Sequence, residues 1–226
     1  MGSVPSLEPS MIGEPEPIRQ CGNSIDTLRR DQLNANAKGS FDMGLHTRFA
    51  VVVASISLAS NPAHAASCVG VAMPNRTSID GTPLVLNGMG VREVTFLKLD
   101  VYVAGLYLER RSDDGKAIAY AEQVKQMRLT FVRDVGRDDM VAELDQAFRK
   151  AAGSEYEKLR TRFEALKSWL PALQPGDKFV TTYRPGKGLE VRHNARLLGI
   201  VPGADFARTV FLAWLGDHPP NAGLKA

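Results

Sequence analysis

The sequence has few cysteines and histidines and lacks the common nucleophile and phosphate-binding motifs. Its 226 residues contain 2 Cys and 4 His, and neither His193 nor His218 has a neighbour at metal-ligand spacing. No GxSxG, P-loop or GxGxxG pattern is present. These shortages argue against zinc enzymes, serine hydrolases and dinucleotide-binding enzymes. We therefore expect no metal and no cofactor.

A strong excess of charge of one sign is also missing. The chain has 28 basic and 25 acidic residues, which gives a formal net charge of +3. From residue 66 onward there are 23 basic and 19 acidic residues, a surplus of +4. This charge is mild and scattered along the sequence, which is typical of a soluble protein. It does not indicate a nucleic-acid partner.

Long apolar runs are absent, but one short run has the features of an export signal. Met43 begins a weakly basic segment, residues 49–60 are apolar, and Ala63-His64-Ala65 is a small-x-small cleavage motif. About a dozen apolar residues are too few to span a bilayer as a helix, which takes roughly 20. We predict a signal peptide at 43–65, cleaved near Ala65, although a buried helix of the domain is an alternative. No integral membrane span is expected in the mature chain.

Residues 1–42 show no sustained apolar period and contain several Pro and Gly. Two readings are open: a disordered leader, or a translation start placed too early at Met1, with Met43 as the true start. We favour the second, because a signal peptide normally begins the chain. The mature protein is then a single domain at 66–226, in the periplasm or secreted.

Cys68 is the one cysteine left after cleavage near Ala65, so no internal disulfide is expected in the mature chain. Its position close to the cleavage site raises the alternative of a lipoprotein. The residues before it, Ala65-Ala66-Ser67, lack the Leu that begins a lipobox. We place the lipoprotein below a soluble exported protein.

Hydrophobic periodicity after the cleavage site predicts strands, then helices, then strands and a last helix. This order indicates an α+β fold, with a large antiparallel sheet and helices packed on one face. Strands are expected at 82–87, 91–95, 97–109, 127–132, 178–183, 189–193 and 196–200, and helices at 116–123, 138–150, 154–170 and 204–215. Ser154 is a candidate N-cap.

The stretch from Leu86 to Glu109 is the most informative part of the chain. Its glycines, in Asn87-Gly88 and at Gly90, predict a turn before the strands. Beyond Phe96 the residues alternate. Five apolar residues are expected on one face: Leu97, Leu99, Val101, Val103 and Tyr107. The other face begins polar and ends apolar: Lys98, Asp100, Tyr102, Ala104, Leu106 and Leu108. Helices or a ligand are expected to cover its apolar end.

Arg92 lies in the most apolar part of the sequence. An arginine buried there without a partner would be very costly, so it must reach water or find an anion. One interpretation is a salt bridge with a nearby acid such as Glu93 or Asp100. The other is a ligand contact, because a guanidinium is a planar fork that suits a carboxylate or an enol oxyanion.

The residues just described carry a resemblance to a known family. The segment NGMGVREVTFLKLDVYVAGLYLE resembles the opening hairpin of the chalcone isomerase fold. It is followed by KQMRLTFVRDVGRDDMVAELDQAF and by a closing helix of the form G-x-D-F-A that ends in WLGD. The ordered set, from about Val69 to Lys225, is similar to the bacterial chalcone isomerase-like group. The resemblance implies an open-faced β-sandwich, in which helices back a large antiparallel sheet.

The resemblance also implies functional positions. Plant members cyclise chalcones, and an Arg after the first Gly segment holds the reacting oxygens. Arg92 matches this Arg, but the polar companions do not carry over. Where the plant members have a Thr on the following strand, this sequence has Tyr102. Their Tyr and Asn correspond to Val135 and Ala142, and their late-helix Thr corresponds to Ala213. These changes argue against chalcone cyclisation.

The fatty-acid-binding branch of the family offers another reading, in which the same Arg and a Tyr hold a carboxylate. Our first hypothesis is therefore a protein that binds a small amphipathic anion such as a fatty acid, through Arg92 and Tyr102. The alternative is an isomerase, an intramolecular lyase, with Arg92 as the catalytic residue that stabilises the oxyanion of an enone or phenolic substrate. A third is an interaction domain with no ligand and a salt-bridged Arg92.

Overall fold

The computed structural model describes residues 21, 65–94 and 99–216. The predicted leader and the predicted signal peptide lie outside these residues, apart from Cys21 and Ala65. Within the described ranges, none of the helices has the length and apolar character needed to cross a membrane.

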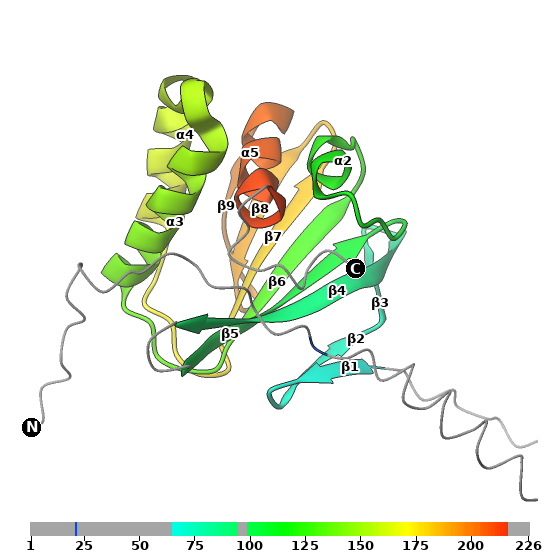
Figure 1. Ribbon diagram of the computed structural model, residues 1–226. Helices are drawn as coiled ribbons and strands as arrows, with labels where there is room; N and C mark the ends of the chain where they lie inside the picture. The colour runs from blue at the N-terminus through cyan, green and yellow to red at the C-terminus, as the bar shows by residue number, and fades with distance from the viewer. Residues whose placement is uncertain (1–20, 22–64, 95–98, 217–226) are drawn as a thin grey trace, which may run out of the picture.

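A curled antiparallel sheet of seven strands forms the centre of the protein (Figure 1). Its strands follow one another in chain order, so each pairs with its sequence neighbours. They are β3 (Arg76–Ile79), β4 (Thr82–Val94), β5 (Leu99–Leu108), β6 (Lys125–Phe131), β7 (Lys178–Arg184), β8 (Gly188–His193) and β9 (Arg196–Val201). A separate hairpin of two strands, β1 (Ala65–Cys68) and β2 (Val71–Pro74), precedes the sheet.

The four α-helices of the described chain lie on one side of the sheet (Figure 1). They are α2 (Gly115–Tyr120), α3 (Arg137–Ala152), α4 (Tyr156–Ser168) and α5 (Ala204–Leu215). The main core fills the space between these helices and the sheet, and a smaller core lies under the β1–β2 hairpin on the opposite face. The predicted α+β fold is confirmed.

The glycine-rich segment at the start of the informative stretch is a strand and does not form a turn. Residues 82–94 are continuous in β4, and the register against β5 shifts between Leu86 and Gly88. Asn87 at this irregularity exchanges two hydrogen bonds with Ser112, at 2.9 and 2.8 Å. The sequence signal was therefore that of a β-bulge, which glycine also favours. The predicted strand end at Thr95 lies outside the described residues.

Strand β5 is buried on both faces from Val101 to Leu108. Tyr102 and Leu106 belong to the core under the helices, whereas Val103 and Tyr107 belong to the core under the β1–β2 hairpin. The predicted alternation is thus confirmed from Tyr102 onward, but Val101 packs in the same core as Tyr102, at a point where the register against β4 shifts. Leu99 departs from the predicted pattern because it is exposed: the elements that cover β5 begin further along the strand.

One further local prediction was wrong. Ser154 does not cap α4: it lies in a 3₁₀ turn, Gly153–Glu155, that joins α3 directly to α4. In the full sequence, a disulfide joins Cys68 to Cys21, with 5.5 Å between the Cα atoms. The sequence prediction assumed a chain that begins after residue 65. A chain that starts at Met43 contains no Cys21, so it cannot form this bond.

The buried Lys125 has a structural role at the end of α2. Its Nζ donates hydrogen bonds of 2.7–2.9 Å to the carbonyl oxygens of Ile118, Ala119 and Ala121. A cation at the carboxyl end of a helix is favoured by the helix dipole. Burial lowers the pKa of Lys125 to about 8. Since backbone carbonyls already occupy its donors, we do not count it among the candidate ligand contacts.

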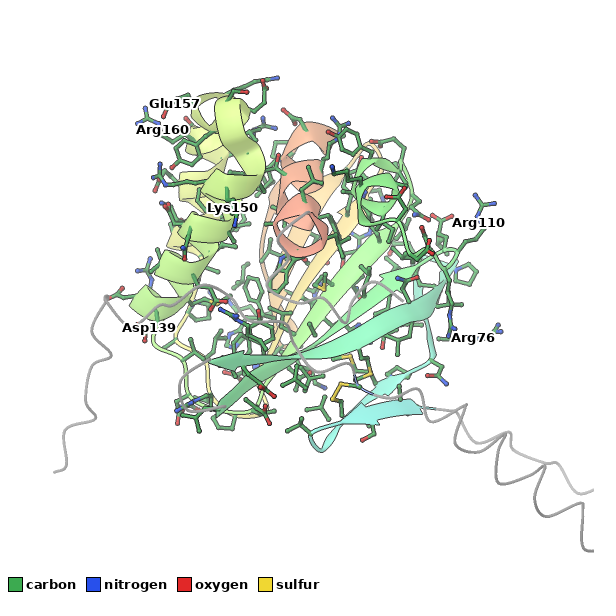
Figure 2. All side chains as sticks on the ribbon, in the orientation of Figure 1. Arg76, Arg110, Asp139, Lys150, Glu157 and Arg160 are labelled. Atoms are coloured by element: carbon green, nitrogen blue, oxygen red, sulfur yellow. A yellow bond between two sulfur atoms is a disulfide. The ribbon has the colours of Figure 1, made fainter. Side chains whose placement is uncertain are left out.

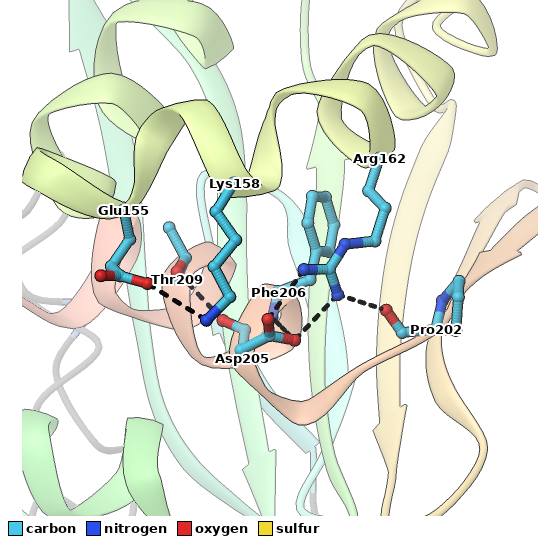
Figure 3. A network of polar contacts seen from close by, with 7 residues as sticks. All are labelled: Glu155, Lys158, Arg162, Pro202, Asp205, Phe206 and Thr209. Carbon is cyan, nitrogen blue, oxygen red and sulfur yellow. Dashed lines mark hydrogen bonds and ion pairs between the residues drawn. The ribbon is translucent and has the colours of Figure 1, made fainter.

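An ion pair joins α4 to the start of α5 (Figure 3). Arg162 makes two hydrogen bonds to the Asp205 carboxylate, at 2.8 and 2.7 Å, and a third to the carbonyl oxygen of Pro202. This contact holds the pKa of Asp205 down at about 2, chiefly through the hydrogen bonds from Arg162. The bidentate pair therefore fixes the first turn of α5 against α4.

Charged side chains of both signs are spread over the exterior, as the composition predicts. Figure 2 labels six exposed examples on the edge strand β3, in the loop after β5, and on α3 and α4: Arg76, Arg110, Asp139, Lys150, Glu157 and Arg160.

Candidate functional site

Arg92 and Tyr102 are brought together by strand pairing. Arg92 of β4 lies directly opposite Tyr102 of β5 in the antiparallel register. Residues directly opposite in such a pair project from the same face of the sheet. Tyr102 belongs to the core under the helices, so both side chains lie on the helix side. The two residues singled out from the sequence are therefore neighbours at one site.

Tyr102 has an unusual environment for a tyrosine. The residue is 2% exposed, and its hydroxyl oxygen has no hydrogen-bond partner in the described part of the chain. Its ring meets those of Phe131 and Trp214 edge-on, with centroids 5.3 and 5.9 Å away. Burial raises the pKa of Tyr102 well above its ordinary value; the charge of Glu143 adds to this shift and that of Arg92 opposes it. The phenol therefore stays protonated and can donate a hydrogen bond.

A small cavity adjoins Tyr102 between β5, α3 and α5. Its volume is about 20 Å³, which is room for roughly one water molecule. The lining is almost entirely apolar and consists of Tyr102, Met140, Glu143, Leu144, Ala147, Ala213 and Trp214. The cavity lies where the sequence predicts an apolar cleft, but it is too small to hold an acyl chain.

Glu143 of α3 is the acid that pairs with Arg92. The Arg92 Nε donates to the Glu143 Oε1 at 3.0 Å, and the two side chains are 12% and 36% exposed. The sequence predicted a salt bridge as one alternative, but it named Glu93 or Asp100 as the acid. Glu143 lies 51 residues further along the chain and comes from another element. Arg92 therefore has an internal carboxylate beside it.

The pattern of residues around Glu143 contains a signal for its role. Met140, Leu144 and Ala147 are spaced three and four residues apart on one face of α3, and Glu143 falls on the same face. A single acid within an apolar helical stripe indicates a partner on the facing element, since burying it unpaired would be costly.

The other positions implied by the family resemblance do not all lie at this site. Ala213 lines the cavity with Tyr102. Ala142 is exposed on α3, and Val135 forms an isolated β-bridge with Leu173. No group of three or more His, Cys, Asp or Glu side chains that could hold a metal occurs among the described residues.

Comparison with known proteins agrees with this architecture. The family model described as chalcone isomerase-like matches residues 65–226. A crystal structure of a fatty-acid binding protein from Arabidopsis thaliana has the same fold, with a TM-score of 0.52 and 21% sequence identity over 67% of this chain and 87% of that one. Among curated proteins, none matches the sequence. The chain belongs to the chalcone isomerase-like family.

Proposed function

We propose that this protein is exported and binds a small amphipathic anion, such as a fatty acid, with Arg92 as the charge clamp and Tyr102 as the hydrogen-bond partner. One observation carries the proposal: the buried Tyr102 hydroxyl has no partner in the described chain, and Tyr102 lies beside a cross-strand arginine and lines an apolar cavity. Buried polar groups are normally hydrogen-bonded, so an unsatisfied one at a cavity suits a ligand.

The chemistry of the two groups suits a carboxylate. A guanidinium offers charged donors in a planar fork, and a neutral phenol adds one more donor. Around them, Met140, Leu144 and Trp214 supply the apolar contacts that an acyl chain would take. A head group held at Arg92 and Tyr102 would point its chain between α3 and α5.

The cavity must open for such a ligand. A volume of about 20 Å³ does not hold an acyl chain. Trp214 is the side chain whose movement would open the space, because it lies near the end of α5 and is half-buried. Binding is therefore expected to change the environment of Trp214, which its fluorescence would report.

The isomerase alternative uses the same two residues. Arg92 would stabilise the oxyanion of an enone or phenolic substrate, and Tyr102 would donate a hydrogen bond to it. The contact between Arg92 and Glu143 counts against this, because a nearby carboxylate offsets the positive charge that an oxyanion needs. We place it second. The isomerase alternative would be favoured over binding if the protein converted a phenolic enone faster than buffer does and Arg92→Gln lost this activity.

Native mass spectrometry of protein purified from the periplasm tests the binding proposal. We expect a co-purified lipid on the wild-type protein and loss of most of it in Arg92→Gln. The matched control is Arg110→Gln, which removes the same charge from an exposed position away from the cavity (Figure 2). Full lipid occupancy in Arg92→Gln would overturn the charge clamp.

A further inference from the structure

We infer that Glu143 is a specificity-determining residue that occupies the place of the ligand's carboxylate on Arg92. The inference rests on the proposed function and deepens it. A ligand anion reaches Arg92 by exchange with Glu143, so the affinity of the site depends on how well the ligand's head group replaces an internal carboxylate.

The geometry of the ion pair suits such an exchange. Arg92 and Glu143 are joined by one hydrogen bond, from Nε to Oε1. The structural pair of Arg162 and Asp205, in contrast, has two. A carboxylate that binds a guanidinium through two parallel hydrogen bonds is held more strongly than one bound through a single bond. A ligand able to bind Arg92 in the bidentate manner would therefore gain over Glu143.

The Glu143 side chain can also move away from Arg92. Its side chain is 36% exposed, against 12% for that of Arg92, so the carboxylate can turn toward water while the guanidinium stays in the site. A carboxylate that moves into water is solvated there and leaves no buried charge behind. The exchange therefore costs little beyond the ion pair itself.

The Glu143 carboxylate and a ligand carboxylate would repel each other beside the Tyr102 hydroxyl. The negative charge of Glu143 acts on this hydroxyl as well as on Arg92. A ligand carboxylate that bridges Tyr102 and Arg92 would lie within reach of the same charge. Two carboxylates that share one site repel each other, which disfavours a state with both on Arg92.

This arrangement predicts which head groups the site selects. An anionic head group must displace Glu143, and it loses part of its binding energy to that competition. A neutral head group, such as an alcohol, binds only the Tyr102 hydroxyl and leaves the ion pair in place. Removal of the charge of Glu143 should therefore strengthen binding of anions and leave neutral ligands unaffected.

Titration of the full chain with decanoate and with decanol, followed by calorimetry, tests the inference. We expect Glu143→Gln to bind decanoate about three- to tenfold more tightly than the wild type, in line with the modest strength of partly exposed ion pairs. Decanol affinity should not change. Glu143→Asp keeps the charge on a shorter side chain, so its affinity for decanoate should lie between those of the wild type and Glu143→Gln. Glu157→Gln, at an exposed position on α4, controls for net charge.

The outcomes separate this inference from the proposed function. If wild-type protein binds decanoate and Glu143→Gln binds it equally or more weakly, the role of Glu143 is overturned and the proposed function stands. If only Glu143→Gln binds decanoate, competition between Glu143 and the ligand for Arg92 is supported, but the proposal that the wild type binds the ligand is not. If neither binds, both are overturned. Melting temperatures of the variants check that each has folded.

Discussion

At the scale of single residues, the unsatisfied hydroxyl of Tyr102 is the clearest sign of a ligand site. A buried polar group without a hydrogen bond costs about 1–3 kcal/mol. The hydroxyl of Tyr107, on the same strand, donates instead to the carbonyl oxygen of Pro74 at 2.9 Å. The two tyrosines lie on opposite faces of β5, so they form a natural pair for comparison.

Replacing each tyrosine by phenylalanine should have opposite effects on stability. Tyr102→Phe removes an unsatisfied group, so we expect no loss, or a gain of up to about 1 kcal/mol, in the free energy of unfolding. Tyr107→Phe removes a satisfied hydrogen bond and should lose about 1 kcal/mol. Chemical denaturation measures both. A clear loss in Tyr102→Phe would mean that the hydroxyl already has a partner.

Sequence reasoning reached Arg92 and Tyr102 but not Glu143, for a physical reason. The first two residues lie in adjoining strands, where alternation places them near one another. Glu143 approaches them from a helix, and how α3 packs on the sheet depends on tertiary contacts that a single sequence does not display. Its position in an apolar stripe was the available signal.

At the scale of secondary-structure elements, α5 and α3 form the walls of the cavity and α4 holds α5 in place. Asp205 lies in the first turn of α5 and is fixed by Arg162 of α4, while Ala213 and Trp214 at the other end of α5 line the cavity. The geometry of the site thus depends on an ion pair remote from it (Figure 3).

The Asp205 contact predicts a pH dependence of stability. Its pKa of about 2 lies below the ordinary value of 3.8, so folding favours the ionised form. The stabilisation is complete above about pH 4 and is lost as the pH falls through 2. Because the side chain is 39% exposed, solvent screening reduces the contribution to about 1 kcal/mol.

Comparison of wild-type protein with Asp205→Asn measures this contribution. We expect the variant to be less stable by about 1 kcal/mol at pH 7, with the difference shrinking to nothing as the pH falls through 2. Asp113→Asn, at an exposed position before α2, controls for the loss of one negative charge. A stability difference that stays constant between pH 7 and 2 would contradict the role assigned to the Asp205 charge.

The elements that sequence analysis found are those with a regular apolar period. Helix α5 was predicted with its observed bounds, because its apolar residues recur at helical spacing and Gly216 follows as C-cap. The β1–β2 hairpin was missed, since its two strands have four residues each and are too short to show a clear alternation. The β4 bulge was taken for a turn, because the same residue types suit both structures.

At the scale of the whole molecule, the sheet order and the family assignment agree with the fold expected from the sequence. The start of the mature chain stays a prediction. It concerns Cys68 directly, since its disulfide partner Cys21 precedes the predicted cleavage site.

Thiol titration and amino-terminal sequencing of the exported protein test this prediction together. A chain processed near Ala65 and separated from the earlier segment should begin at Ala66 and show one thiol per molecule when denatured, from Cys68. A chain that retains Cys21 in its disulfide should show none. An amino terminus before residue 21 with no free thiol would contradict the export signal at 43–65.

A crystal structure of the protein with bound decanoate tests the central claim most directly. We predict that the ligand's carboxylate lies within hydrogen-bond distance of the Arg92 guanidinium and the Tyr102 hydroxyl, that Glu143 has turned toward solvent, and that Trp214 has moved to admit the acyl chain. A structure in which decanoate binds elsewhere, while Arg92 keeps Glu143 and the cavity at Tyr102 stays closed, would contradict the account.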